Sequence, residues 1–185
     1  FRTDYVDINP ITSVPDRITF TKNDKIQDIW QSGAIHEANC PAHNQTITLS
    51  ANQSIDKGII VTNCQVRFGA NSQITDVVVV TTNTNTDSIS GAAGVIIGLD
   101  DNCAPGGGAQ LVTLGGMNFP SQLEAYGSQF VAAGDVDFEA QANGIEGISI
   151  VAGGEIDGTS LMNMGFCGGT GLENNFMAEY FRLAT

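Results

Sequence analysis

The chain has 185 residues, 42% of them hydrophobic, and a net charge of −13 from 20 acidic and 7 basic residues. This length and apolar content suit one domain with a sizeable core. The strong negative charge disfavours binding to nucleic acid or to an anionic membrane surface, and no stretch approaches the roughly 18 consecutive apolar residues of a membrane span. Because the chain starts at Phe1 instead of Met, we expect a mature or trimmed product.

Residues 1–45 are predicted to form a lead-in, a short capping helix and a loop. The first 16 residues carry two X-Pro pairs and should be extended. A helix is indicated where apolar residues recur at i, i+3 and i+4, after a capping residue and before Gly33: Ile26, Ile29 and Trp30, capped by Asn23 or Asp24. Its apolar stripe should cover the first coil of a stacked structure. Residues 34–45 are expected to be a loop.

Residues 46–171 are predicted to form a right-handed parallel β-solenoid, so the fold class is all-β. Three segments superpose without a gap: 110–119, 129–138 and 149–158. Leu111, Phe130 and Ile150 coincide, so the periods are 130 − 111 = 19 and 150 − 130 = 20 residues. Periods near twenty are typical of stacked repeats, and each unit holds two short β-branched pieces divided at a glycine. A single unit cannot bury its apolar side alone.

The superposition also predicts which side chains form the core. It places Val131 on Val151 and Val136 on Ile156, so we expect these four residues and Phe138 to point inward. Earlier strands are predicted at 46–49, 58–61, 64–68, 76–81 and 94–97, with polar loops at 82–90 and 100–108. Residues 172–185 are predicted to cap the last coil, with Leu172, Phe176, Met177, Tyr180 and Phe181 at near-helical spacing.

Four cysteines are present: Cys40, Cys64, Cys103 and Cys167. Their even number, without C-x-x-C spacing, favours two disulfides formed in an oxidising compartment. Four cysteines allow three pairings. We prefer Cys40–Cys64, which flanks the start of the solenoid, and Cys103–Cys167, which would tie its middle to its end.

Several strings are typical of one family: Val61-Thr-Asn-Cys64-Gln-Val-Arg-Phe68, Asp100-Asp-Asn-Cys103, Tyr126-Gly-Ser-Gln129, Met164-Gly-Phe-Cys167 and Glu179-Tyr-Phe-Arg-Leu183. Through them the chain resembles, over about residues 40–183, the C-terminal region of alphaproteobacterial TadE/TadG-like proteins. These are assembly proteins, also called pseudopilins or minor pilins, of Flp (Tad) pili. The resemblance implies an exported protein, periplasmic or at the cell surface, anchored in the inner membrane by an N-terminal hydrophobic helix that this chain does not include. It implies no enzymatic activity.

Four acids suggest a different function. Asp135 and Glu155 share one repeat position, and Asp137 and Asp157 share another. Carbohydrate-cleaving β-helices use clustered acids of this kind, in which like charges raise one pKa. A solvated row of acids at turns explains the pattern more simply, and no Lys or Arg lies in 110–158 to hold an anionic sugar.

Two groups of residues could hold a metal. His36, Cys40 and His43 have suitable spacing, but a disulfide-bonded Cys40 cannot act as a thiolate ligand. Asp100, Asp101 and Asn102 offer oxygen ligands for calcium, although Asx side chains that cap a turn explain them equally well. We therefore expect no metal and no cofactor.

The sequence thus predicts a non-enzymatic structural ectodomain that takes part in assembly or decoration of a Tad-type pilus, with a role in adhesion. Its partners would be other proteins of the pilus system. Because of the charge of −13, we expect isolated copies to repel one another at low salt and association to need a less acidic partner. The alternative is a carbohydrate-binding or carbohydrate-cleaving β-helix protein.

Overall fold

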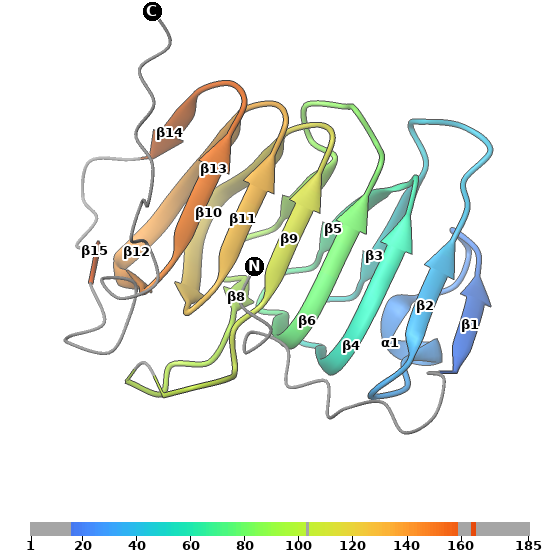
Figure 1. Ribbon diagram of the computed structural model, residues 1–185, viewed down its shortest axis with the longest axis horizontal. Coiled ribbons are helices and arrows are strands. Elements are labelled where there is room, and N and C mark those ends of the chain that lie inside the picture. The colour runs from blue at the N-terminus through green and yellow to red at the C-terminus, as the bar shows by residue number, and fades with distance from the viewer. Residues whose placement is uncertain (1–15, 103, 159–163, 166–185) are drawn as a thin grey trace, which may run out of the picture.

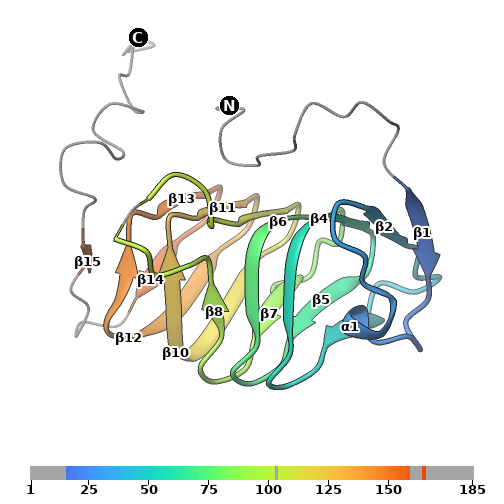
Figure 2. The ribbon, with the colours of Figure 1, turned by 90° about the horizontal axis from the view of Figure 1, so that it is seen from below.

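The computed structural model describes residues 16–102, 104–158 and 164–165. The chain winds into a parallel β-solenoid of about seven turns, in which neighbouring strands pair in parallel (Figure 1). Each complete turn contributes strands to three faces that enclose the core (Figure 2). The prediction of an all-β parallel solenoid is confirmed.

Face I is the longest ladder. It is built, in order, from β1 (Arg17–Phe20), β2 (Ile35–Ala38), the second half of β4 (Ser54–Thr62), the second half of β6 (Gln73–Thr81), β9 (Gln110–Thr113), β11 (Gln129–Ala132) and β13 (Ser149–Ala152). Its register places Leu111 beside Phe130 and Phe130 beside Ile150. The gap-free superposition predicted from the sequence is therefore confirmed.

Faces II and III complete each turn. Face II contains β3 (Thr46–Leu49), β5 (Gln65–Phe68), β7 (Ile89–Gly91), the starts of β10 (Met117–Tyr126) and β12 (Val136–Glu146), and β14 (Ile156–Gly158). Face III contains the starts of β4 and β6, β8 (Ile96–Ile97), the ends of β10 and β12, and β15 (Met164–Gly165). One long strand such as β10 thus contributes to two faces.

The corner between faces II and III is formed by residues in the left-handed backbone region. Successive turns place Asn52 (φ 58°), Asn71 (φ 53°), Gly94 (φ 72°) and Gln122 (φ 52°) there. Asparagine tolerates this conformation better than other residues with a Cβ. The Asn71 side chain also donates a 3.3 Å hydrogen bond to Oδ1 of Asn52 one turn earlier.

The corner between faces I and II is held by a column of buried threonines. Thr62, Thr81 and Thr113 are register partners on face I. Thr81 Oγ1 accepts a hydrogen bond from the backbone N–H of Asn83 at 3.1 Å and donates one to the carbonyl of Cys64, one turn earlier, at 2.6 Å. Each hydroxyl therefore satisfies backbone groups at a bend and joins it to the previous turn.

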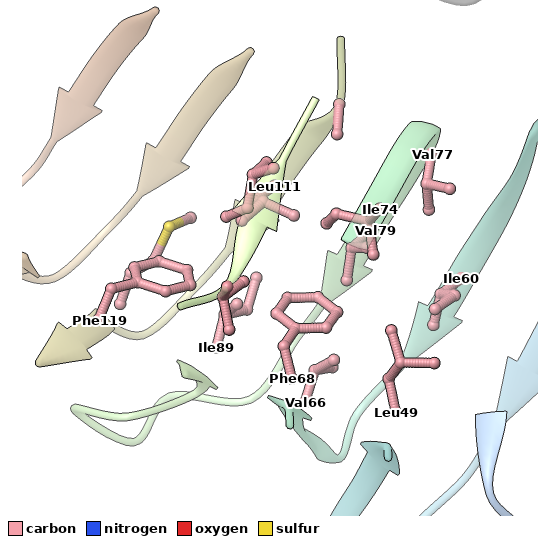
Figure 3. Close-up of a cluster of buried hydrophobic side chains, with 14 of the residues drawn as sticks. Leu49, Ile60, Val66, Phe68, Ile74, Val77, Val79, Ile89, Leu111 and Phe119 are labelled. Carbon is pink, nitrogen blue, oxygen red and sulfur yellow. The ribbon is translucent and has the colours of Figure 1, made fainter. Parts of the chain in front are cut away.

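The core is a continuous stack of apolar side chains from all three faces (Figure 3). Its fully buried members include Phe68, Phe119, Phe130, Leu49, Ile60, Ile74 and Leu111. In face I the inward positions on β11 and β13 are Phe130, Ala132, Ile150 and Ala152. Every inward side chain rests on the equivalent side chain of the next turn, which is why similar residues recur.

Two expectations about this core are confirmed, two are wrong, and one residue points inward without being buried. Val136 and Phe138 are buried as predicted. Val131 and Val151 instead point outward, because each lies next to an inward-pointing residue, Phe130 or Ile150, and successive side chains of a strand alternate. Ile156 is a register partner of Val136 and points to the same side, but it is 51% exposed on the last full turn described.

The solenoid begins earlier in the chain than the sequence indicated. Helix α1 (Ile26–Ile29) confirms the predicted short helix, and its Ile26 is fully buried in the core. Its N-cap is Lys25, not Asn23 or Asp24; the Asp24 carboxylate accepts hydrogen bonds from Thr21 instead. The prediction of a loop over 34–45 is wrong in part, because residues 35–38 form β2, which pairs with β1 and β4. The predicted cap at 172–185 lies outside the described residues.

Candidate functional site

The outward side chains of face I form two columns. Register fixes the first as Arg17, Ile35, Ile59, Val78, Gln110, Gln129 and Ser149, and the second as Thr19, Glu37, Val61, Val80, Val112, Val131 and Val151. Most are isoleucine or valine. We name the surface made by these two columns the β-branched face.

The β-branched face is apolar and accessible to solvent. Val61 is 41% exposed and Val151 is 55% exposed, and the valines between them are partly exposed. Strands that stack in parallel and carry apolar residues on both sides are normally covered on both sides. Strand β6 shows this composition most clearly, since residues 77–80 are all valine. Face I therefore has the residue composition of a sheet that is covered by other structure on its outer side.

The β-branched face carries almost no charge. Its two charged residues, Arg17 and Glu37, lie on β1 and β2 and pair with each other through Nη1 and Oε1. From β4 to β13 neither column contains an Asp, Glu, Lys or Arg. In a chain of net charge −13 this leaves one long surface without electrostatic repulsion.

The outward surfaces of faces II and III are polar. On face II the column reads Thr48, Arg67, Ser90, Asn118, Asp137 and Asp157. On face III, Tyr126 donates a 3.1 Å hydrogen bond to Glu124 Oε2. Partial burial, and then the charge of Glu124, raise the pKa of Tyr126 to about 12. The apolar composition of the outward columns on face I is therefore not a general property of this solenoid.

The acids predicted from the repeats lie on neighbouring turns. Asp137 and Asp157 are register partners at exposed positions of face II. The Asp135 carboxylate accepts a 2.8 Å hydrogen bond from the backbone N–H of Glu155, so it supports the corner of the next turn. All four acids are exposed on the outward surface.

The loop that was considered for calcium projects at the corner between faces III and I. Asp101 Oδ1 accepts a 3.0 Å hydrogen bond from the N–H of Ala104, and Asn102 adopts a φ of 57°. Asp101 thus closes a turn, as an Asx side chain does. The hollow between this loop, Tyr126 and Glu146 has a volume of about 20 Å³, room for about one water molecule. Asp100 is exposed, and Cys103 and Cys167 lie outside the described residues.

The three residues considered for a second metal site have separate structural roles. Cys40 forms a disulfide with Cys64, as predicted, with Cα atoms 5.3 Å apart. His36 is fully buried on face I and stacks on Trp30. His43 is exposed, and its carbonyl accepts hydrogen bonds from the side chains of Asn83 and Asn85. Within residues 16–102, 104–158 and 164–165, no cluster of His, Cys, Asp or Glu could hold a metal ion.

His36 is the one buried imidazole of the described chain. Its Nε2 accepts a 3.1 Å hydrogen bond from the backbone N–H of Gln31, so Nδ1 carries the proton of the neutral ring. Burial lowers the pKa of His36; backbone contacts with Ile59 and Ile29 oppose this by a smaller amount, without giving Nδ1 a well-formed hydrogen bond. The neutral ring is therefore part of the N-terminal packing.

Residues 1–168 match the family model described as a domain of unknown function, DUF7867. The chain belongs to the DUF7867 family. Comparisons with curated proteins and with solved structures gave no match. In this DUF7867 chain, the described part has no helix that is long and apolar enough to cross a membrane. The site with the clearest physical signature is the β-branched face, which is apolar and exposed.

Proposed function

We propose that this domain is a non-enzymatic structural ectodomain that acts through contacts with other proteins. The observation that carries the proposal is the β-branched face, an apolar surface without charged residues from β4 to β13, on a solenoid whose other faces are polar. Covering the part from β4 to β13 removes apolar area from water and desolvates no charged side chain. Sites for catalysis on small molecules are usually concave and contain converging polar groups, whereas this surface is formed by stacked strands.

Two further observations support a cellular location and an assembly in which this contact would form. The Cys40–Cys64 disulfide favours an oxidising compartment, and hence an exported, periplasmic or cell-surface protein. The resemblance to TadE/TadG-like proteins supports a role in assembling or decorating a Tad/Flp pilus and in surface attachment. On this proposal the protein would be held at the membrane by a segment outside the chain shown.

The alternative function, binding or cleavage of carbohydrate, has one favourable observation. Asp137 and Asp157 lie side by side on exposed positions of adjacent turns, as in a surface that could contact sugar hydroxyls. However, the Asp135 carboxylate is already engaged with the backbone of Glu155. The protein-contact function therefore has the stronger support.

The proposal is tested by deleting the gene in the organism of origin and restoring it with wild-type or variant protein. We expect the deletion to reduce pili and surface attachment, and the wild type and an Asp137→Asn, Asp157→Asn double variant to restore both. The purified chain should show no turnover of glycans. Normal pili in the deletion strain, together with glycan cleavage that the double variant lacks, would establish the carbohydrate function instead.

A further inference from the structure

We propose that the β-branched face binds a second copy of this chain, forming a weak face-to-face dimer. This inference deepens the proposed function, since it names the partner of the same surface and rests on that surface being a protein contact. It is carried by two features of the face, its even, repeated relief and its lack of charge from β4 to β13, and the area of the face sets the strength of the contact.

The first feature is self-complementarity. From β4 to β13 the second column reads Val61, Val80, Val112, Val131 and Val151, one valine for each strand at a constant strand spacing. Two identical arrays have the same spacing and the same height, so valines of one sheet can fill the gaps between valines of the other. Sheets pack in this way at about 10 Å, with their strands within about 30° of each other.

The second feature is the position of the few polar groups. The uncharged part of the face contains Gln110, Gln129 and Ser149, all in the first column at one margin. These side chains both donate and accept hydrogen bonds, so the same residues of a second copy can satisfy them. A different protein would usually be selected by charges, and between β4 and β13 the two columns provide none. An uncharged surface of this regularity is matched by the same surface on a second copy.

The size of the face limits the strength of the contact. With strands about 4.8 Å apart, seven strands extend roughly 29 Å, and a four-residue strand extends roughly 13 Å. Each copy would therefore cover roughly 380 Å², and the pair roughly 750 Å², which is below the area of standard stable interfaces. The dimer should accordingly be weak and concentration-dependent. Copies held side by side at a membrane or along a pilus would have the high local concentration that a weak contact needs.

Net charge gives the dimer a diagnostic salt dependence. Each copy carries −13, so the copies repel one another at low ionic strength, where the Debye length at about 10 mM salt is about 30 Å. At about 1 M salt the Debye length falls to about 3 Å, and the apolar contact is unopposed. Association should thus strengthen as salt is added, unlike an association held by ion pairs.

The test is sedimentation velocity of the purified full chain over a wide concentration range at both salt concentrations. We expect monomers at low salt and a monomer–dimer equilibrium at high salt. Val80→Lys, on the central strand β6, should abolish the dimer, because it would bury a charge between the sheets. This change lowers the net negative charge from −13 to −13 + 1 = −12, so charge alone would favour association.

Ser90→Lys is the matched control, because it adds the same charge at an outward position of face II. It should dimerise like the wild type, and both variants should melt like the wild type. A wild type that stays monomeric at high salt, a Val80→Lys dimer, or equal loss in both variants would overturn the inference. So would a dimer that forms only after removal of residues 1–15, since that result assigns the face to this chain's own N-terminal segment.

Failure of this inference can be distinguished from failure of the proposed function. A monomeric chain that still restores pili in the deletion strain would reject the dimer and leave the protein-contact function standing. A chain that dimerises through Val80, from a gene whose deletion leaves pili and attachment unchanged, would support the dimer and reject the pilus role.

Discussion

The indole ring of Trp30 lies flat on the imidazole ring of His36, with ring centroids 4.1 Å apart and ring planes inclined by 8°. Gly58 makes room for this pair, since a Cβ at that position would lie 2.6 Å from Cζ2 of Trp30. Trp30 also donates a 2.9 Å hydrogen bond to the carbonyl of Asp56. The first turns of the solenoid are therefore packed around a neutral, buried histidine.

This pairing predicts a loss of stability in mild acid. Burial lowers the folded-state pKa of His36 below its unfolded value of about 6.5, so unfolding takes up a proton. The contribution is fully present above pH of about 6.5 and is lost as the pH falls from there through the folded pKa. Thermal melting between pH 8 and pH 5 should show this loss, and a His36→Phe variant, which keeps an aromatic ring, should show a smaller one. Equal pH profiles for the two proteins would contradict the account.

The inward position of Val136 predicts a severe defect from a buried charge. Val136 is fully buried on face II, and its neighbour Asp137 points outward. Val136→Asp should cost about 4 kcal/mol or more and prevent folding, because the new carboxylate has no partner in the core. Asp137→Asn is the neighbouring control and should change the melting temperature little. Circular dichroism melting separates the two, and an unaltered Val136→Asp protein would show that the register is wrong.

The Cys40–Cys64 disulfide predicts a stability that depends on oxidation. It closes a sequence separation of 24 residues, for which chain entropy predicts about 3 kcal/mol of stabilisation. In a chain of this size, reduction should lower the melting temperature by about 6–12 °C. Mass spectrometry of the unreduced, alkylated chain should recover a Cys40–Cys64 peptide and should also test the predicted Cys103–Cys167 pair. A peptide linking Cys40 to Cys103 would refute both pairings.

Three of the repeat acids, Asp135, Asp137 and Asp157, should differ in their response to substitution. Asp137→Asn and Asp157→Asn remove neighbouring like charges and should leave stability unchanged or raise it by a few tenths of a kcal/mol. Asp135→Ala removes the acceptor of the Glu155 N–H and should lower stability by about 1 kcal/mol. Urea denaturation measures both effects. An equal response to the three substitutions would show that the Asp135 carboxylate has no structural role.

The periodicity of the sequence was sufficient to predict the solenoid and the register of its last turns. Leu111, Phe130 and Ile150 are adjacent in space because a stacked fold repeats each inward position once per turn. The predicted inward direction of Val131 and Val151 was wrong because face I carries apolar residues on both of its sides. Where inward and outward residues are both apolar, alternation no longer indicates which one is buried.

Strand β2 could not be predicted from an apolar pattern, because one of its two inward residues is His36. The spacing of the turns was also irregular there: 35 − 17 = 18 residues from β1 to β2, then 59 − 35 = 24 residues to β4. The β-branched face did have a signal in the sequence, the run of four valines at 77–80. Such a run is typical of a parallel strand that is covered on both sides.

On our proposal, the β-branched face carries the protein contacts of this domain. The most direct measurement is photo-cross-linking in cells, with a photoreactive amino acid at position 80 in the full-length protein and, as a control, at position 90. We predict a covalent adduct with a protein, either a second copy or a pilus component, from position 80 and little or none from position 90. Absence of an adduct at position 80, or equal adducts at both positions, would contradict the claim.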